Sequence, residues 1–131
     1  MPEENNTEQC GDSNKTFTSS QGQLLVGDKK YTVRSLKMNG ATMMFLGSAE
    51  PECLDEMAVA MQMPQDGQII GTTILGAQSS ITDSQRLAEQ FTRRYGRQFF
   101  VSFNVQVDRM TAPLLEKQLN EYMRNNKELF V

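Results

Sequence analysis

The chain has 131 residues, of which 38% are hydrophobic, 22% charged and 8% aromatic, as expected for one globular domain. It contains no histidine and only two cysteines, which excludes an imidazole-based catalytic triad and a zinc site of three or four Cys/His ligands. The composition therefore favours binding or scaffolding over catalysis, and we expect no catalytic residue, metal or cofactor.

The formal net charge of −3 is concentrated near the N-terminus. Residues 1–22 hold one basic residue, Lys15, against four acidic residues, Glu3, Glu4, Glu8 and Asp12. Residues 23–131 are neutral, with twelve residues of each sign, and have no general attraction for nucleic acid or an anionic membrane. The first segment is almost entirely polar, so we expect a disordered tail over 1–22 and a single domain over 23–131.

The start of the sequence lacks the basic and apolar regions of a secretory signal. The longest apolar run, residues 41–46, is too short to cross a bilayer. Because one of the two cysteines, Cys10, lies in the predicted tail, we expect no structural disulfide and a reduced cytoplasmic or nuclear setting.

The first half of the predicted domain is rich in strand signals. Alternating residues 30–38 predict a strand with a bulge near Ser35, and Asn39-Gly40 predicts a hairpin turn into a second strand over 41–47. That second strand is apolar on both faces, which is typical of a central position. Residues 54–63 fit both helical and strand spacing, with composition slightly favouring a helix, and residues 69–75 predict a further strand.

The second half predicts helix, strand and helix. Thr82 with Gln85 forms a capping box before a helix over 83–95, which Gly96 ends. Apolar residues occupy every second position over 98–107, which predicts a strand. A final helix is predicted over 111–127, with Pro113 in its first turn.

Three groups of residues could carry chemistry. The acidic pairs Glu50/Glu52 and Asp55/Glu56 flank a predicted turn and are better explained as solvated surface. Cys53 has no histidine partner and is surrounded by carboxylates, which disfavour a reactive thiolate.

The third group is a cluster of basic and aromatic residues. Arg93, Arg94 and Arg97 precede Phe100-Val101-Ser102-Phe103, which matches the last four positions of an RNA-recognition motif. The first four positions of that motif fail, so a small RNA-binding module remains the alternative function, with helix capping and core packing as the structural explanation.

The pattern also predicts a sheet face that the two helices leave uncovered. If residues 99, 101, 103, 105 and 107 face the helices, the opposite face carries Met44, Leu46, Phe100 and Ser102. A face this apolar calls for a cover, so these four residues are the candidate partner or dimer surface.

Several segments, in order, resemble the proteasome assembly chaperone 4 family. They are Phe45-Leu46-Gly47, Met57-Ala58-Val59-Ala60-Met61, Thr72-Thr73-Ile74-Leu75-Gly76, Gln85-Arg86-Leu87-Ala88, Gln98-Phe99-Phe100-Val101-Ser102-Phe103-Asn104 and Glu128-Leu129-Phe130. The resemblance covers about residues 31–130. The polar tail, the methionine-rich positions and length differences around 64–68 and 82–86 depart from it.

The resemblance implies an α+β fold in which a mainly antiparallel sheet of about six strands carries two helices. It also implies that residues 54–63 form a strand, in a hairpin with residues 41–47, and not a helix. It also implies a non-enzymatic cytoplasmic chaperone that pairs with a proteasome assembly chaperone 3-like protein and binds α-type proteasome subunits to promote formation of the α-ring. Whether the isolated chain forms a homodimer stays open.

Overall fold

The computed structural model describes residues 17–48, 52–76 and 81–131. The elements in chain order are β1 (Thr18–Val26), β2 (Lys29–Lys37), β3 (Ala41–Ser48), β4 (Met57–Gln62), β5 (Ile69–Leu75), α1 (Asp83–Tyr95), β6 (Gln98–Asn104), α2 (Ala112–Asn125) and a 3-10 turn, η2 (Lys127–Leu129).

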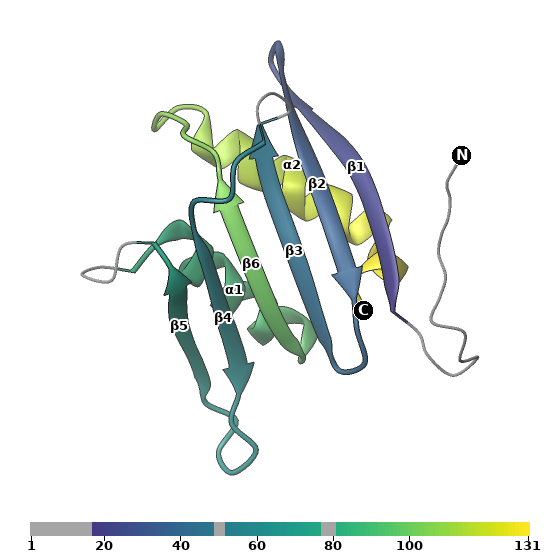
Figure 1. The fold of residues 1–131 in the computed structure, drawn as a ribbon, viewed down its shortest axis with the longest axis vertical. Helices are drawn as coiled ribbons and strands as arrows, with labels where there is room; N and C mark the ends of the chain where they lie inside the picture. The colour runs from purple at the N-terminus through teal and green to yellow at the C-terminus, as the bar shows by residue number, and fades with distance from the viewer. Residues whose placement is uncertain (1–16, 49–51, 77–80) are drawn as a thin grey trace.

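The six strands form one sheet in the order β1-β2-β3-β6-β4-β5 (Figure 1). All neighbours are antiparallel except β3 and β6, which run parallel. Helix α1 carries the chain from the edge strand β5 back to the centre of the sheet, where β6 lies between β3 and β4. Such a crossover is required because β6 runs parallel to β3. The predicted α+β fold, a mainly antiparallel sheet of six strands with two helices, is confirmed.

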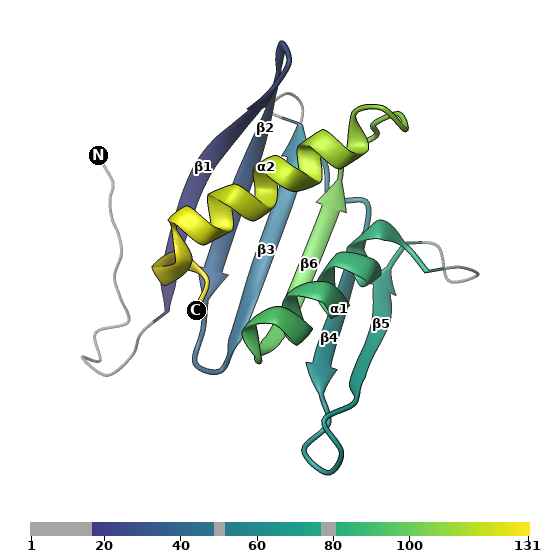
Figure 2. The same cartoon turned by 180° about the vertical axis from the view of Figure 1, so that it is seen from behind.

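Both helices pack on the same face of the sheet, α1 over β4, β5 and β6 and α2 across the β1–β3 half (Figure 2). No helix of residues 17–48, 52–76 or 81–131 lies on the opposite face (Figure 1). The molecule therefore has two layers.

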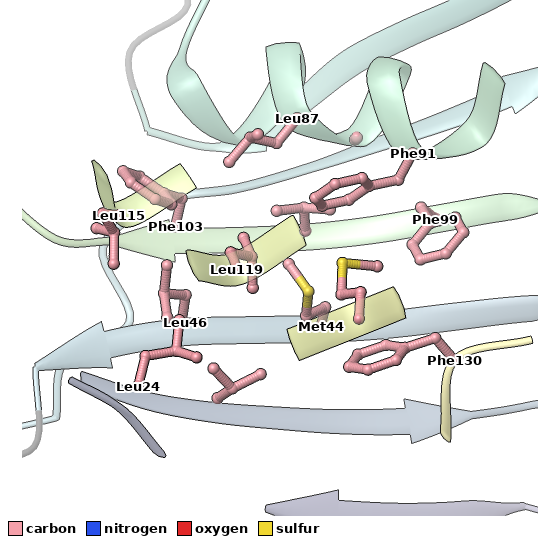
Figure 3. Packing of buried hydrophobic residues seen from close by; sticks show 14 of the residues in the cluster. Leu24, Met44, Leu46, Leu87, Phe91, Phe99, Phe103, Leu115, Leu119 and Phe130 are labelled. Carbon is pink, nitrogen blue, oxygen red and sulfur yellow. The ribbon is translucent and has the colours of Figure 1, made fainter. Parts of the chain in front are cut away.

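The hydrophobic core lies between the sheet and the helices (Figure 3). Every second residue of the central strands points into it, because side chains alternate along a strand. The core residues with no more than 5% exposure include Met44, Leu46, Phe99, Val101, Phe103, Leu87, Phe91, Leu115, Leu119, Met123 and Phe130.

Helix α1 begins and ends as predicted. The Gln85 backbone N–H donates to the Thr82 hydroxyl over 3.1 Å, which satisfies one of the free amides of the first turn. Gly96 adopts φ 71°, a left-handed conformation that ends the helix with a bond from its N–H to the Thr92 carbonyl.

Helix α2 is shorter than predicted and is followed by η2. The turn that leads into it is closed by Asp108, whose carboxylate accepts from the Thr111 N–H over 2.8 Å. This bond holds the pKa of Asp108 below its usual value. At the other end Phe130 is buried, and Lys37 Nζ donates to the Glu128 carbonyl over 2.7 Å, so the segment after α2 is fixed against β2.

The predicted boundary of the tail is wrong, because residues 18–22 are part of β1. Serine, glutamine and glycine here form a strand through pairing with β2, in a register that runs from Thr18 opposite Lys37 to Val26 opposite Lys29. Intrinsic strand propensity is weaker than such pairing. Residues 1–16 lie outside the described part of the chain.

Three further predictions about strands need correction. Residues 57–62 form strand β4, as the resemblance implied and composition did not, but its partners are β5 and β6 instead of β3. The register of β2 passes Ser35 without a bulge. The strand predicted over 98–107 ends at Asn104 as β6. The side-chain oxygen of Asn104 accepts hydrogen bonds from the backbone N–H groups of Asp55 and Glu56.

Candidate protein-interaction site

The uncovered side of the sheet carries a row of apolar side chains. Met43 on β3 lies opposite Phe100 on β6, which in turn lies opposite Val59 on β4. Their sequence neighbours Met44, Val101 and Ala60 are buried on the helix side, so alternation places this row on the other side.

The row extends into a larger apolar surface, which we call the open face. It consists of the side chains of Met43, Phe45, Val59, Met61, Ile70, Ile74 and Phe100. Met61, Ile70 and Ile74 are 42%, 46% and 51% exposed. Large side chains this exposed on adjoining strands mark an interaction surface.

Polar side chains border the open face on the β1–β2 side. Arg34 donates from Nε and Nη2 to the two carboxylate oxygens of Glu52, over 3.1 and 2.9 Å, and from Nη1 to Gln21 over 3.0 Å. The hydrogen bonds between the two charged groups raise the pKa of Arg34 and lower that of Glu52. A partner packed on the sheet would therefore meet an apolar half and a charged border.

Of the four residues predicted for this surface, only Phe100 contributes exposed area to it. Met44 and Leu46 are 0% exposed because they lie beside Val101 and Phe103 in the parallel ladder and face the helices with them. Their predicted position is wrong, and Met43 and Phe45 occupy it instead. β3 is apolar on both faces, so its sequence gave no sign of which set faces the helices.

Ser102 points toward the uncovered side but is only 1% exposed. Its hydroxyl donates to the Glu56 carbonyl over 2.6 Å and accepts from Asn104 Nδ2 over 2.8 Å. The segment before β4 therefore covers Ser102. The role of this serine is structural, because its hydroxyl bonds to that segment and to Asn104.

A polar link between this segment and α1 was missed by sequence reasoning. The Glu56 carboxylate accepts from both the N–H and the hydroxyl of Ser84, and the same hydroxyl accepts from the Phe103 N–H over 2.9 Å. Glu56 was predicted to be solvated, yet it is half-buried and bonded. No local pattern indicates a contact between residues 28 positions apart.

The predicted basic cluster is divided among different tasks. Arg97 Nη2 donates to the carbonyls of Met38 and Ala41, over 2.7 and 2.9 Å, and so fixes the turn between β2 and β3. Arg94 bonds to Asn120 over 2.9 Å and lies 5.9 Å from the Tyr95 ring centroid, while Arg93 is exposed.

The aromatic part of the cluster is divided as well. Phe99 and Phe103 are buried beneath the helices, and Phe100 points to the opposite side. The RNA-recognition pattern requires two aromatic rings on one exposed face. Phe100 and Phe103 do not meet this requirement, because they lie on opposite faces of the sheet.

The other candidate residues are the acidic pairs and Cys53. Among the described residues, no three His, Cys, Asp or Glu side chains lie close enough to hold a metal ion. Cys53 is exposed, Glu52 is paired with Arg34, and Glu50 lies outside the described residues. Neither α1 nor α2 is long and apolar enough to cross a membrane.

A two-layer domain with an apolar, helix-free sheet face defines a class of protein-interaction module. Similarity to known proteins identifies the family. The model of the family described as Proteasome assembly chaperone 4 matches residues 30–105. A human protein with the name Proteasome assembly chaperone 4 is 35% identical over 88 residues, which cover 66% of this chain and 71% of that protein. The chain belongs to the proteasome assembly chaperone 4 family, which confirms the resemblance seen in the sequence.

A solved structure shares the fold. It is a chain from the crystal structure of a chaperone complex for yeast 20S proteasome assembly, with a TM-score of 0.59 and 12% identity. The match covers 85% of this chain and 98% of the yeast chain, so it extends beyond the 76 residues of the family match.

Proposed function

We propose that this chain is a non-catalytic chaperone for assembly of the 20S proteasome. It pairs with a proteasome assembly chaperone 3-like protein, and the pair binds α-type subunits and promotes formation of the α-ring. Family membership and the fold shared with a chain of a yeast assembly complex support this proposal.

The single observation that carries the pairing is the open face. A sheet covered on one side only normally presents polar residues to water on the other, whereas Met43, Phe100 and Val59 form an apolar row here. A partner with the same two-layer fold would bring a second uncovered sheet. Two such sheets can pack face to face about 10 Å apart with side chains interdigitating.

Such a chaperone acts by binding alone. It holds a subunit in an assembly-competent arrangement and leaves when later subunit contacts compete for the same surface. This mechanism needs shape and buried apolar area but no proton transfer, which is consistent with a chain that contains no histidine.

A pull-down of the full chain from cytoplasmic extract, analysed by mass spectrometry, tests the proposal. We expect recovery of one small chaperone-like partner together with α-type subunits. Phe100→Asp places a charge in the centre of the open face and should abolish recovery of the small partner. Gln118→Asp, on the exposed side of α2, is the matched control and should leave recovery unchanged.

Three results would contradict the proposal. Equal recovery by Phe100→Asp and Gln118→Asp would remove the open face from the interaction. Recovery of ribonucleoproteins, lost steeply as salt rises, would favour the RNA-binding alternative. A dimer of the isolated chain in analytical ultracentrifugation, with no other partner recovered, would make a second copy the occupant of the open face.

A further inference from the structure

A separate feature lies at the end of the molecule where both helices finish. Four exposed basic residues gather there: Arg93 and Arg94 in the last turn of α1, Arg124 in the last turn of α2, and Lys127 in η2. Within the described part of the chain, none of the four forms an ion pair with Asp66, Glu121 or Glu128, the acidic residues of the same end, or with any other described residue.

Contacts between elements hold these residues on one surface, which we call the basic end. The bond from Arg94 to Asn120 joins the last turn of α1 to α2. Cations at a helix C-terminus complement the helix dipole. This accounts for Arg93 and Arg94 at the end of α1 and, separately, for Arg124 and Lys127 at the end of α2 and in η2. Figure 2 shows that the two helices finish toward the same end of the sheet. The positive charges of their last turns therefore add.

The chain enters the sheet beside this surface. Thr18, the first residue of β1, pairs with Lys37, and Lys37 donates to the carbonyl of Glu128 in η2. The start of β1 therefore lies next to Lys127. The sixteen residues before Phe17 can span up to ~50 Å when extended, which is enough to reach α1 from this point.

Those sixteen residues carry the opposite charge. They contain Glu3, Glu4, Glu8 and Asp12 against Lys15, a net charge of −3. We propose that the acidic segment 3–12 contacts the basic end of its own chain and shields it from other polyanions. Exposed ion pairs are individually weak, so the contact depends on several pairs at once and is removed by salt.

Spin labelling provides a direct test on the full chain. The Cys53→Ser variant leaves Cys10, within the acidic segment, as the single cysteine for a nitroxide label. We expect the label to broaden the amide signals of residues 93–96 and 124–128 by at least about threefold more than in a neutralised tail carrying Glu3→Gln, Glu4→Gln, Glu8→Gln and Asp12→Asn. The difference should vanish at roughly 1 M salt, where the Debye length is ~3 Å.

Matched variants of the folded part separate charge from tethering. Arg93→Gln, Arg124→Gln and Lys127→Gln together should reduce the broadening to the level of the neutralised tail. Lys29→Gln, Lys30→Gln and Arg109→Gln, exposed cations at the opposite end, should leave it unchanged.

Three outcomes would overturn the proposal. The first is equal broadening with the native and neutralised tails, which would leave tethering alone as its cause. The second is broadening that persists at high salt. The third is broadening only between a labelled and an isotope-enriched molecule in a mixed sample, which would assign the contact to a second copy.

Discussion

The Glu56 carboxylate accepts two hydrogen bonds from Ser84, one from its backbone N–H over 2.9 Å and one from its hydroxyl over 2.7 Å. Ser84 lies in the first turn of α1, where unpaired amides and the helix dipole favour a negative charge. Glu56, from the β3–β4 connection, therefore caps the N-terminus of α1 in addition to Thr82. The same connection covers Ser102 and limits how far the open face extends.

We predict that Glu56→Ala lowers the free energy of unfolding by about 1.5–3 kcal/mol, because it removes charge-assisted bonds and leaves the buried Ser84 amide without its acceptor. Chemical denaturation followed by circular dichroism measures the change. Asp55→Ala is the matched control, since the Asp55 side chain is exposed and only its backbone is bonded, and it should shift stability by less than ~0.5 kcal/mol. Equal effects of the two substitutions would refute the role of Glu56.

The neighbours Met43 and Met44 provide a second test, because they face opposite sides of β3. Met44→Ala should cost about 2–5 kcal/mol of stability, since it opens a cavity in a core where Met44 is 0% exposed. Met43→Ala should cost less than ~1 kcal/mol, because its side chain lies on the open face, and instead weaken pairing with the proposed chaperone 3-like partner. Denaturation and a binding titration of each variant measure both quantities. A larger loss of stability for Met43→Ala would mean that the two faces are assigned the wrong way round.

The sequence predicted the elements better than their relations. Hydrophobic alternation located β2 and β6, the Asn39-Gly40 turn located β3, the β-branched composition located β5, and capping residues located α1, because these signals are local. The phase of β3 was wrong because Met43, Met44, Phe45 and Leu46 are all apolar, and only pairing with a strand more than 50 residues away decides which of them are buried. β1 was missed for the same reason, since its polar sequence becomes a strand only beside β2. The candidate site was therefore predicted as an uncovered apolar face, but with two of its residues on the wrong side.

The pair of Arg34 and Glu52 predicts a dependence on pH. Because the hydrogen bond to Arg34 lowers the pKa of Glu52 in the folded chain, the pair stabilises the fold fully above the usual glutamate value of 4.5. That contribution disappears as pH falls through the lower pKa of the folded state. Titration of the Glu52 carboxyl by carbon-13 NMR should show a pKa below 4.5 that returns toward it in Arg34→Gln. An unchanged pKa in Arg34→Gln would mean that the pair does not persist in solution.

The packing of α2 on β1 depends on a close approach at Gly22. A methyl group added to Gly22 would stand 2.8 Å from Cζ of the Tyr122 ring, closer than two carbon atoms can pack. Gly22→Ala should therefore force Tyr122 aside and lower the free energy of unfolding by about 1–3 kcal/mol. Tyr122→Leu removes the far end of the ring, so in that background Gly22→Ala should cost distinctly less, and the four chains form a double-mutant cycle measured by urea denaturation. Additive effects would show that the two residues are not in contact, and that β1 is held by its pairing with β2 alone.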